Sequence, residues 1–271
     1  MLGALIRQLD PGRIVITFDL SKSKYRLGKH PEYKKRKWKD NDPMRHQILK
    51  FYEQLTVLQE VLAHYPVSIL GEEIVGWEAD DAIAYIVSQF NAGKYSAVHK
   101  VNIISADKDL CALVGKQVNW YDPLNEKLVT ESNFKETFGV AISQFPDYKA
   151  IKGDPGDNIP HVNGMGEKLA IKLLTEYGTL AKMMELKVER VLQHQAVLNL
   201  AYDLVRLDLH DRFPEDPVWK NIDNKLLVEP GFNKDRLIEI YQILSFKSVL
   251  EEFPVMSERW NLFFEAGKKL Q

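Results

Sequence analysis

The sequence predicts an α/β fold in which a mostly parallel central sheet is flanked by helices and followed by a helical domain. Three observations support this prediction: apolar runs in the first half, amphipathic segments between them, and little strand-like sequence after about residue 140. Continuous apolar runs are typical of strands buried on both faces of a parallel sheet, and their alternation with helices is typical of α/β layers. We therefore expect an α/β core at residues 1–145 and a helical domain at residues 146–271.

The expected strands are the runs 13–19 (RIVITFD), 67–70 (VSIL) and 101–105 (VNIIS). A helix should begin at Asp42-Pro43, a favourable cap and first-turn pair, and a second helix fits residues 78–90. The first of these helices has an apolar face made of Ile48, Phe51, Tyr52, Leu55, Leu58, Val61 and Leu62. In the second half of the chain, we expect helices over 166–177, 188–208 and 232–244.

Composition excludes several classes of protein. The 271 residues are 45% hydrophobic and 27% charged, which suits one large or two modest folded domains rather than a disordered chain. No apolar run reaches the roughly 18 residues of a membrane span. The single cysteine, Cys111, excludes an internal disulfide and a cysteine-rich zinc site. We expect a soluble, cytoplasmic protein that does not contact a membrane.

Charge is concentrated in one segment. Residues 22–39 hold nine Lys or Arg and one acid, so they carry +8 while the rest of the chain carries −10. Tyr25, Tyr33 and Trp38 lie among these cations. A basic segment with aromatic side chains suits binding of nucleic acid. A solvated loop or a localisation signal is the alternative interpretation.

Six acidic residues follow the predicted strands or begin the next helix, and two more lie in the turn-like segment GDPGDNIP (153–160). Each group alone could be a helix cap or a turn, but the carboxyl ends of parallel strands meet at one sheet edge, where ligands bind. Clustered carboxylates without His or Cys predict Mg²⁺ or Mn²⁺, and two such ions suit phosphodiester hydrolysis. Together with the basic segment, they predict a metal-dependent nuclease. The acids are Asp19, Glu78, Asp80, Asp81, Asp107, Asp109, Asp154 and Asp157.

Other catalytic patterns are absent from the sequence. It contains no G-x-x-x-x-G-K-[ST] loop, no G-x-G-x-x-G after a strand and no G-x-S-x-G elbow. The seven histidines show no metal-ligand spacing.

Four segments resemble the 5′→3′ exonuclease/flap endonuclease family, in that family's order and spacing. They are FDLSKSKYRLGKHPEYKKRK (18–37), GWEADDAIA (76–84), IISADKDL (103–110) and KGDPGDNIPHVNGMGEKLAIKLL (152–174). The resemblance spans about residues 1–210. It implies a PIN-like nuclease core with a helical arch over about 22–64, and a helix–three-turn–helix over about 153–177. Without a polymerase region, the chain is similar to the stand-alone, bacteriophage-type members.

The resemblance also implies roles for individual residues. All eight acids match metal ligands of the family. Lys34 matches a catalytic lysine that contacts the scissile phosphate, and Arg26 aligns with an arginine near the path of that phosphate. The glycine turn at residues 162–168 would bind duplex phosphates and a K⁺ ion, and free N–H groups at a helix start support this independently. The implied DNA-binding residues are Lys29, Tyr33, Lys35, Arg36, Lys37, Gly164, Gly166 and Lys168.

One family feature is missing from the sequence. The family opens with a strand that ends in an aspartate, upstream of the position of Asp19, whereas Met1–Gln8 resembles the helix after that strand. Three explanations stay open: the sequence is truncated, the missing piece comes from another chain, or this homologue lacks one metal ligand. Because the affinity for a hard cation depends on ligand charge and number, one metal site should be weakened.

The sequence therefore predicts a monomeric, Mg²⁺- or Mn²⁺-dependent, structure-selective 5′ nuclease of a bacterial or phage-infected cell. Its substrates would be 5′ ends or 5′ flaps of DNA and RNA primers in RNA–DNA hybrids. Two alternatives stay open: a catalytically weak or inactive DNA-junction-binding homologue, and a PIN-like single-strand ribonuclease. The balance of exonuclease and endonuclease activity is open as well.

Overall fold

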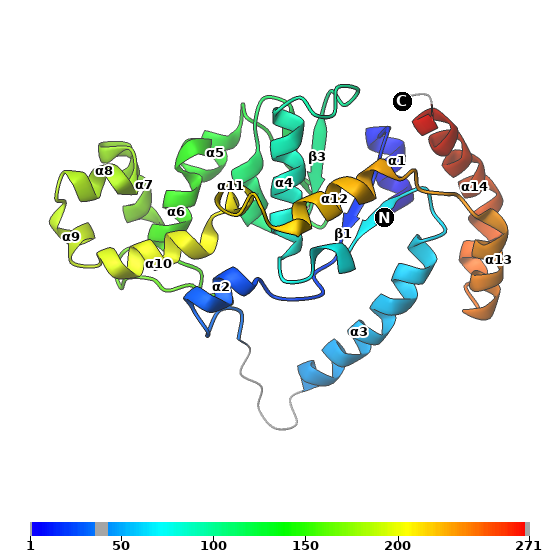
Figure 1. Cartoon of the computed structure of the whole chain (residues 1–271), viewed down its shortest axis with the longest axis horizontal. Helices are drawn as coiled ribbons and strands as arrows, with labels where there is room; N and C mark the ends of the chain where they lie inside the picture. Colours follow the sequence, from blue (N-terminus) through cyan, green and yellow to red (C-terminus); the bar gives the residue numbers. More distant parts are fainter. Residues whose placement is uncertain (1, 36–42, 269–271) are drawn as a thin grey trace. The chain divides into compact units, whose positions relative to one another are not determined.

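The computed structural model describes residues 2–35 and 43–268, whose course is shown in Figure 1. Contacts between residues divide this part of the chain into two compact units. The first unit comprises residues 2–20, 43–75 and 217–268, and the second comprises residues 21–35 and 76–216. No helix among the described residues is long and apolar enough to cross a membrane.

The first unit contains a two-stranded parallel sheet. Strand β1 (Val15–Thr17) pairs with β2 (Ser68–Leu70), with Val15 opposite Ser68, so both predicted strands are confirmed. Its core joins Val61 and Leu62 to side chains from the last two helices, such as Tyr241 and Trp260. The helical elements are α1 (Leu2–Leu9), α3 (Pro43–Leu62), η1 (Glu72–Ile74), α12 (Pro217–Leu227), α13 (Lys234–Ile243) and α14 (Lys247–Lys268).

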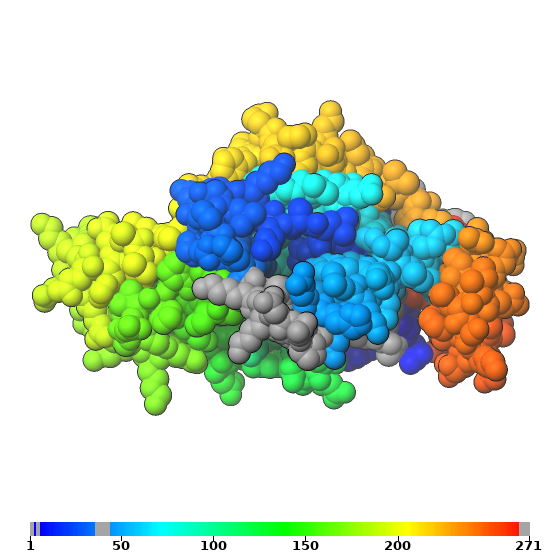
Figure 2. All heavy atoms as spheres, turned by 90° about the horizontal axis from the view of Figure 1, so that it is seen from below, coloured from blue at the N-terminus to red at the C-terminus, as the bar shows by residue number. Residues whose placement is uncertain are grey.

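Helix α3 forms where the sequence predicts it, but most of its apolar face is not in a core. Phe51 is 57% exposed and Tyr52 56% exposed, and Leu58 is also exposed; side chains of α3 lie at the surface in Figure 2. Only the C-terminal end of the helix, at Val61 and Leu62, enters the core of the unit. The apolar period predicted the helix correctly but did not predict what covers its face.

The second unit contains a three-stranded sheet. Strand β3 (Val101–Ile104) pairs in parallel with β4 (Val118–Asp122), and β4 pairs antiparallel with β5 (Lys127–Val129). The strand expected at 101–105 is thus confirmed, whereas β4 and β5 were not predicted. The described strands form two sheets. The expected parallel pairing occurs once in each unit, between β1 and β2 and between β3 and β4.

Helices make up the rest of the second unit. Helix α10 (Gln195–Val205) packs on α6 (Phe145–Lys152) and on α2 (Lys24–Lys29), so this unit continues across the boundary expected at residues 145 and 146. The helix expected over 188–208 is divided into separate helices because His194 leaves helical geometry. The helical elements are α2 (Lys24–Lys29), α4 (Ala79–Asn91), η2 (Lys108–Leu113), α5 (Phe134–Phe138), η3 (Ile142–Gln144), α6 (Phe145–Lys152), η4 (Pro155–Asp157), α7 (Glu167–Tyr177), α8 (Leu180–Glu185), α9 (Glu189–Leu192), α10 (Gln195–Val205) and α11 (Leu209–Arg212).

Candidate active site

The first acidic group lies at the start of helix α4. Glu78 is the N-cap residue, and Asp81 Oδ2 accepts the backbone N–H of Glu78 at 3.0 Å. This is one half of a capping box, which satisfies a donor that the helix leaves free. Glu78 and Asp81 are buried, at 3% and 1% exposure. Two buried carboxylates need positive charge beside them, because isolated buried charges are unfavourable.

Arg26 provides that charge from helix α2. Its Nη1 donates to Glu78 Oε2 at 3.0 Å and to Asp81 Oδ2 at 2.8 Å, and its Nη2 donates to Asp81 Oδ1 at 2.9 Å. The other two N–H groups donate to the carbonyls of Leu204 (2.9 Å) and Arg206 (3.0 Å). Burial favours a lower pKa for Arg26, but the attraction of Asp81 outweighs it and raises the pKa further above its usual range.

This arrangement corrects the expectation for Arg26. All five guanidinium donors are used within the protein, and the side chain is 2% exposed. Arg26 therefore has no donor left for a phosphate. In the structure, Arg26 holds the carboxylates of Glu78 and Asp81 in place.

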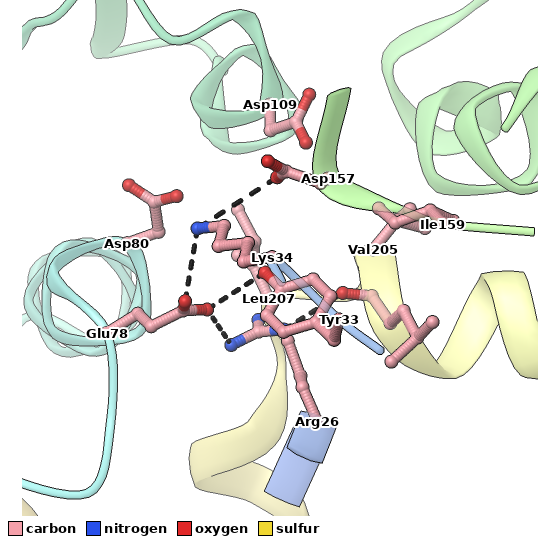
Figure 3. A pocket seen from close by; sticks show the side chains of 11 residues that line it. Arg26, Tyr33, Lys34, Glu78, Asp80, Asp109, Asp157, Ile159, Val205 and Leu207 are labelled. Atoms are coloured by element: carbon pink, nitrogen blue, oxygen red, sulfur yellow. Dashed lines mark hydrogen bonds and ion pairs between the residues drawn. The ribbon is translucent and has the colours of Figure 1, made fainter. Parts of the chain in front are cut away.

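Tyr33 and Lys34 complete the surroundings of Glu78 (Figure 3). The Tyr33 hydroxyl donates to Glu78 Oε2 at 3.0 Å, and Lys34 Nζ lies 3.1 Å from Glu78 Oε1. Burial raises the pKa of Tyr33, while the attraction of Glu78 raises the pKa of Lys34 against the effect of its burial. Tyr33 is only 4% exposed. The expectation that it contacts DNA does not fit this burial.

The loop that carries Lys34 is tied to the loop that carries Asp157. The N–H of Lys34 donates to the carbonyl of Asp157 at 2.9 Å. Asn158 Nδ2 donates to the carbonyls of Glu32 (2.8 Å) and Lys35 (2.9 Å). Lys34 and Asn158 both have positive φ, 50° and 55°, a conformation that asparagine tolerates better than most residues. These bonds bring the basic segment beside the GDPGDN loop.

Four more candidate acids, Asp107, Asp109, Asp154 and Asp157, lie on or cap two short 3₁₀ helices. Asp107 caps η2, where its Oδ1 accepts the N–H of Asp109 at 2.8 Å. Asp154 caps η4, where its Oδ1 accepts the N–H of Gly156 at 3.0 Å. Lys149 connects them: its Nζ is 2.5 Å from Asp109 Oδ1 and 3.1 Å from Asp154 Oδ2. We had not predicted Lys149, because a lysine in the last turn of a helix is an ordinary surface residue in sequence.

The charges in this group shift the pKa values in different directions. Burial raises the pKa of Asp109, and Lys149 only partly offsets it. Burial likewise raises the pKa of Asp157, against the attraction of Lys34. At Asp154, the hydrogen bond from Lys149 outweighs burial and lowers the pKa. At Asp109 and Asp157, the nearby lysines therefore do not fully compensate for the effect of burial on the ionised carboxylate.

Acids from three elements line one pocket (Figure 3). Lys34 extends among them, and Tyr33 lies below. Asp81 is buried against Arg26 rather than open to the pocket, and Asp19 follows β1 in the first unit. The lining residues are Arg26, Tyr33, Lys34, Glu78, Asp80, Asp109, Asp157, Ile159, Leu204, Val205 and Leu207.

The donor set of this pocket suits a hard cation, because it consists of carboxylate oxygens. As they stand, no three His, Cys, Asp or Glu side chains of the described residues converge closely enough to surround one ion. Lys34 bridges Glu78 and Asp157, and Lys149 bridges Asp109 and Asp154. Positive charge therefore already lies between the carboxylates, in the form of ammonium groups that a divalent ion could replace.

The other residues expected to bind DNA are mostly at the surface. Lys29 pairs with Asp203 at 3.1 Å, and Lys35 pairs with Glu32 at 2.7 Å. Both lysines are exposed. Arg36 and Lys37 lie outside the described residues.

The glycine turn has the predicted form. Gly164 has φ 77°, which favours glycine, and its carbonyl accepts Arg190 Nη2 at 3.0 Å. Gly166 is the N-cap of α7, and Lys168 is exposed in the first turn of that helix. Arg190 was not predicted, because it comes from a separate helix.

Comparison with known proteins identifies the family. Residues 1–139 match the model of the 5′-3′ exonuclease N-terminal resolvase-like domain, and residues 140–222 match that of the 5′-3′ exonuclease C-terminal SAM fold. The chain belongs to the 5′-3′ exonuclease family. The family suggested by the four motifs is confirmed.

Several relatives of this family member are known. The 5′-3′ exonuclease of Aquifex aeolicus is 33% identical over 258 residues, which cover 93% of this chain and 82% of that protein. The flap endonuclease Xni of Tolumonas auensis is 31% identical, covering 76% of each chain. DNA polymerase I of Caldicellulosiruptor bescii is 32% identical over 91% of this chain, which spans only 28% of that longer protein.

Solved structures show the same fold. The 5′-exonuclease of bacteriophage T5 with divalent zinc ions bound has a TM-score of 0.70 at 22% identity, over 84% of this chain and 88% of that one. The T5 flap endonuclease in a complex with DNA and metal ions has a TM-score of 0.64 at 20% identity, over 98% and 88% of the two chains. The predicted α/β nuclease core with a helical domain is thus confirmed.

Proposed function

We propose that this family member is a metal-dependent, structure-selective 5′ nuclease that hydrolyses phosphodiesters at 5′ ends or 5′ flaps of DNA. The observation that carries the proposal is the pocket of Figure 3, where Lys34 reaches between acids of three elements, Glu78, Asp109 and Asp157. The family membership, the relatives named exonuclease or flap endonuclease, and the DNA-bound structural neighbour support it.

The metal would be held by pocket carboxylates. Glu78, Asp80, Asp109 and Asp157 are the candidate ligands that line it, and Asp107 and Asp154 cap the short helices that carry two of them. Oxygen donors favour Mg²⁺ or Mn²⁺, and we propose two ions. When bound, such ions would activate water and stabilise the leaving oxygen. Asp19 in the first unit remains a predicted ligand, and Asp81 would support Glu78 through Arg26.

Lys34 would stabilise charge on the scissile phosphate. Its ammonium is held near Glu78 and Asp157, at 3.1 and 3.9 Å, and its side chain is 26% exposed, so a bound phosphate could reach it. A positive charge already oriented toward the reacting group needs little reorganisation during the reaction. We therefore propose Lys34 as the catalytic side chain, with the metal ligands as the other part of the site.

Binding of the DNA would involve two further surfaces. Lys29, Lys35, Arg36 and Lys37 would contact the single-stranded 5′ end, while Gly164, Gly166 and Lys168 would contact the duplex. Backbone N–H groups at the start of α7 suit a phosphate, and carbonyls of the same turn would suit K⁺. We further propose that the protein acts as a cytoplasmic monomer and also accepts RNA–DNA hybrids.

A cleavage assay with defined substrates tests this proposal. The purified chain should cut a labelled 5′-flap DNA in Mg²⁺ or Mn²⁺ and lose this activity in chelator. The paired substitution of Asp107→Asn with Asp109→Asn should abolish cleavage and leave flap binding in Ca²⁺ intact, because loss of negative charge reduces repulsion of the phosphate. Glu131→Gln, an exposed acid outside the pocket, is the control.

Three outcomes would contradict the proposal. Binding of flap DNA without cleavage under any divalent metal would favour a DNA-junction-binding homologue. Faster cleavage of single-stranded RNA would favour a PIN-like ribonuclease. Equal loss of binding and cleavage in the double variant would mean that Asp107 and Asp109 are structural.

A further inference from the structure

Of the two lysines that bridge acids in the candidate active site, Lys149 has the less exposed side chain. The proposed function assigns no role to it. Its side chain is 12% exposed, compared with 26% for Lys34. The ammonium contacts two candidate metal ligands that come from different elements, Asp109 of η2 and Asp154 at the cap of η4.

We infer that Lys149 is an internal counter-ion that occupies the space between Asp109 and Asp154 when no metal is bound, and that it competes there with the divalent cation. This inference rests on the proposed metal-dependent function. It concerns how tightly this chain binds its metal rather than whether it cleaves DNA.

The contacts of Lys149 support this competition. Its Nζ lies 2.5 Å from Asp109 Oδ1 and 3.1 Å from Asp154 Oδ2, so it uses one oxygen of each carboxylate. A divalent ion that binds either of these oxygens approaches an atom that the ammonium already contacts, and meets a like charge a few ångströms away. The ammonium would have to leave before the ion could bind with full strength.

The position of Lys149 on its helix allows such a movement. Neighbouring residues Tyr148, Ala150 and Ile151 are buried in the core, so the backbone of α6 is fixed. The lysine side chain, in contrast, has a flexible four-carbon stem that ends in a compact charge. The ammonium can therefore turn away from Asp109 while the helix stays in place.

Without metal, Lys149 has a stabilising effect. The ammonium lies between the carboxylates of Asp109 and Asp154, so removing its positive charge increases their mutual repulsion. The same substitution should therefore destabilise the metal-free protein and tighten metal binding. A lysine with a purely structural role would produce only the first effect.

The test compares Lys149→Met with Lys152→Met in the full chain. Lys152 lies on the same helix, but its side chain is 41% exposed and its ammonium pairs at 3.6 Å with Glu167, outside the acid cluster. The probe is Mn²⁺, with free Mn²⁺ measured by electron paramagnetic resonance. We expect Lys149→Met to lower the Kd for Mn²⁺ by about tenfold or more, and Lys152→Met to change it by less than about twofold.

Thermal unfolding gives the second readout. In chelator, Lys149→Met should have a lower Tm than the wild type, and saturating Mn²⁺ should raise its Tm by more than it raises that of the wild type. If Lys149→Met binds Mn²⁺ no more tightly than the wild type, the inference is overturned. If the wild-type chain binds no Mn²⁺ at all, the proposed metal-dependent function fails as well.

A measurement on the wild-type chain covers the case in which Lys149→Met does not fold. An ammonium held by two carboxylates should give a slowly exchanging ¹⁵N–¹H signal by NMR, assigned by its loss in Lys149→Arg. We expect Mg²⁺ to remove or strongly shift this signal. A signal that stays unchanged at a Mg²⁺ concentration that saturates the protein would overturn the inference.

Discussion

The backbone N–H of Lys34 donates to the carbonyl of Asp157 at 2.9 Å, so the candidate catalytic lysine and a candidate metal ligand lie on hydrogen-bonded loops. The ammonium of Lys34 lies 3.9 Å from the carboxylate of the same aspartate. A change in one loop should therefore alter the other, and the phosphate contact and the metal ligands should respond together.

Replacing Lys34 should slow the chemical step more than it weakens binding. For Lys34→Ala, we expect the single-turnover rate on flap DNA to fall about 100-fold, as for other groups that stabilise charge in a transition state, with a small change in Kd. Lys35→Ala is the matched control, since the side chain of Lys35 is exposed and its ammonium pairs with Glu32 rather than with an acid of the pocket. It should weaken binding and reduce the slope of log K against log salt by about one unit. Identical effects of the two variants would argue against a special role for Lys34.

Replacing Arg26 should destabilise the fold as well as the site. Arg26→Met leaves Glu78 and Asp81 buried without their partner, and removing one member of a buried ion pair costs about 3–5 kcal/mol. Urea unfolding should show this loss, and Arg26→Lys should not restore it, because an ammonium cannot replace five fixed donors. Lys29→Met on the same helix, with an exposed pair to Asp203, should cost less than about 1 kcal/mol. A soluble Arg26→Met protein of normal stability would contradict this account.

Asn158 should be sensitive to substitution because of both its backbone and its amide. Asn158→Gly keeps the positive φ and loses the bonds to the carbonyls of Glu32 and Lys35, whereas Asn158→Ala loses both features. We expect destabilisation of about 1–3 kcal/mol for Asn158→Ala and less for Asn158→Gly. Amide hydrogen exchange at Lys34 should accelerate in both variants, since its partner Asp157 lies on the loosened loop. Unchanged exchange at Lys34 would show that the loops move independently.

Asp147 predicts a pH dependence of stability. It lies in the first turn of α6, is 8% exposed, and burial raises its pKa to about 6, with the N–H of Leu180 partly opposing the shift. Because the folded pKa lies above the unfolded value of about 4, its contribution is fully present below pH 4 and is lost as the pH rises through 6. Asp147→Asn should therefore raise the free energy of unfolding at pH 7.5 by about 2–3 kcal/mol, and change it little at pH 4. A destabilised variant at pH 7.5 would reverse this conclusion.

The sequence predicts the acids of the site better than it predicts their surroundings. The strand end before Asp109 and the helix start at Glu78 suggested that these two acids would lie together, and both line the pocket. Asp157, which lines it too, was suggested by the GDPGDNIP motif rather than by the end of an element. The partners of Arg26 could not be predicted in the same way, since two of them are backbone carbonyls and any residue type supplies a carbonyl. Lys149 was missed for a related reason: its role depends on packing between η2 and α6.

Similar reasons explain what the fold prediction missed. Strand β4 has the sequence VNWYD, with polar residues at two buried positions, Asn119 and Asp122, so it shows neither an apolar run nor a clean alternation. Helix α3 was predicted from its apolar period, but periodicity does not distinguish a core face from an exposed one. The exposure of Phe51 and Tyr52 depends on which other elements reach them.

The guanidinium of Arg26 also has a consequence for how the protein is made. Its acceptors at Leu204 and Arg206 lie 178 and 180 residues further along the chain, so a nascent chain cannot complete this cluster until residue 206 has left the ribosome. Until then, Arg26 can pair with Glu78 and Asp81, but two of its N–H groups lack their acceptors, the carbonyls of Leu204 and Arg206. Contacts of such sequence separation also form slowly. The nuclease site should therefore be among the last parts of the second unit to become ordered, which would delay activity until synthesis has passed α10.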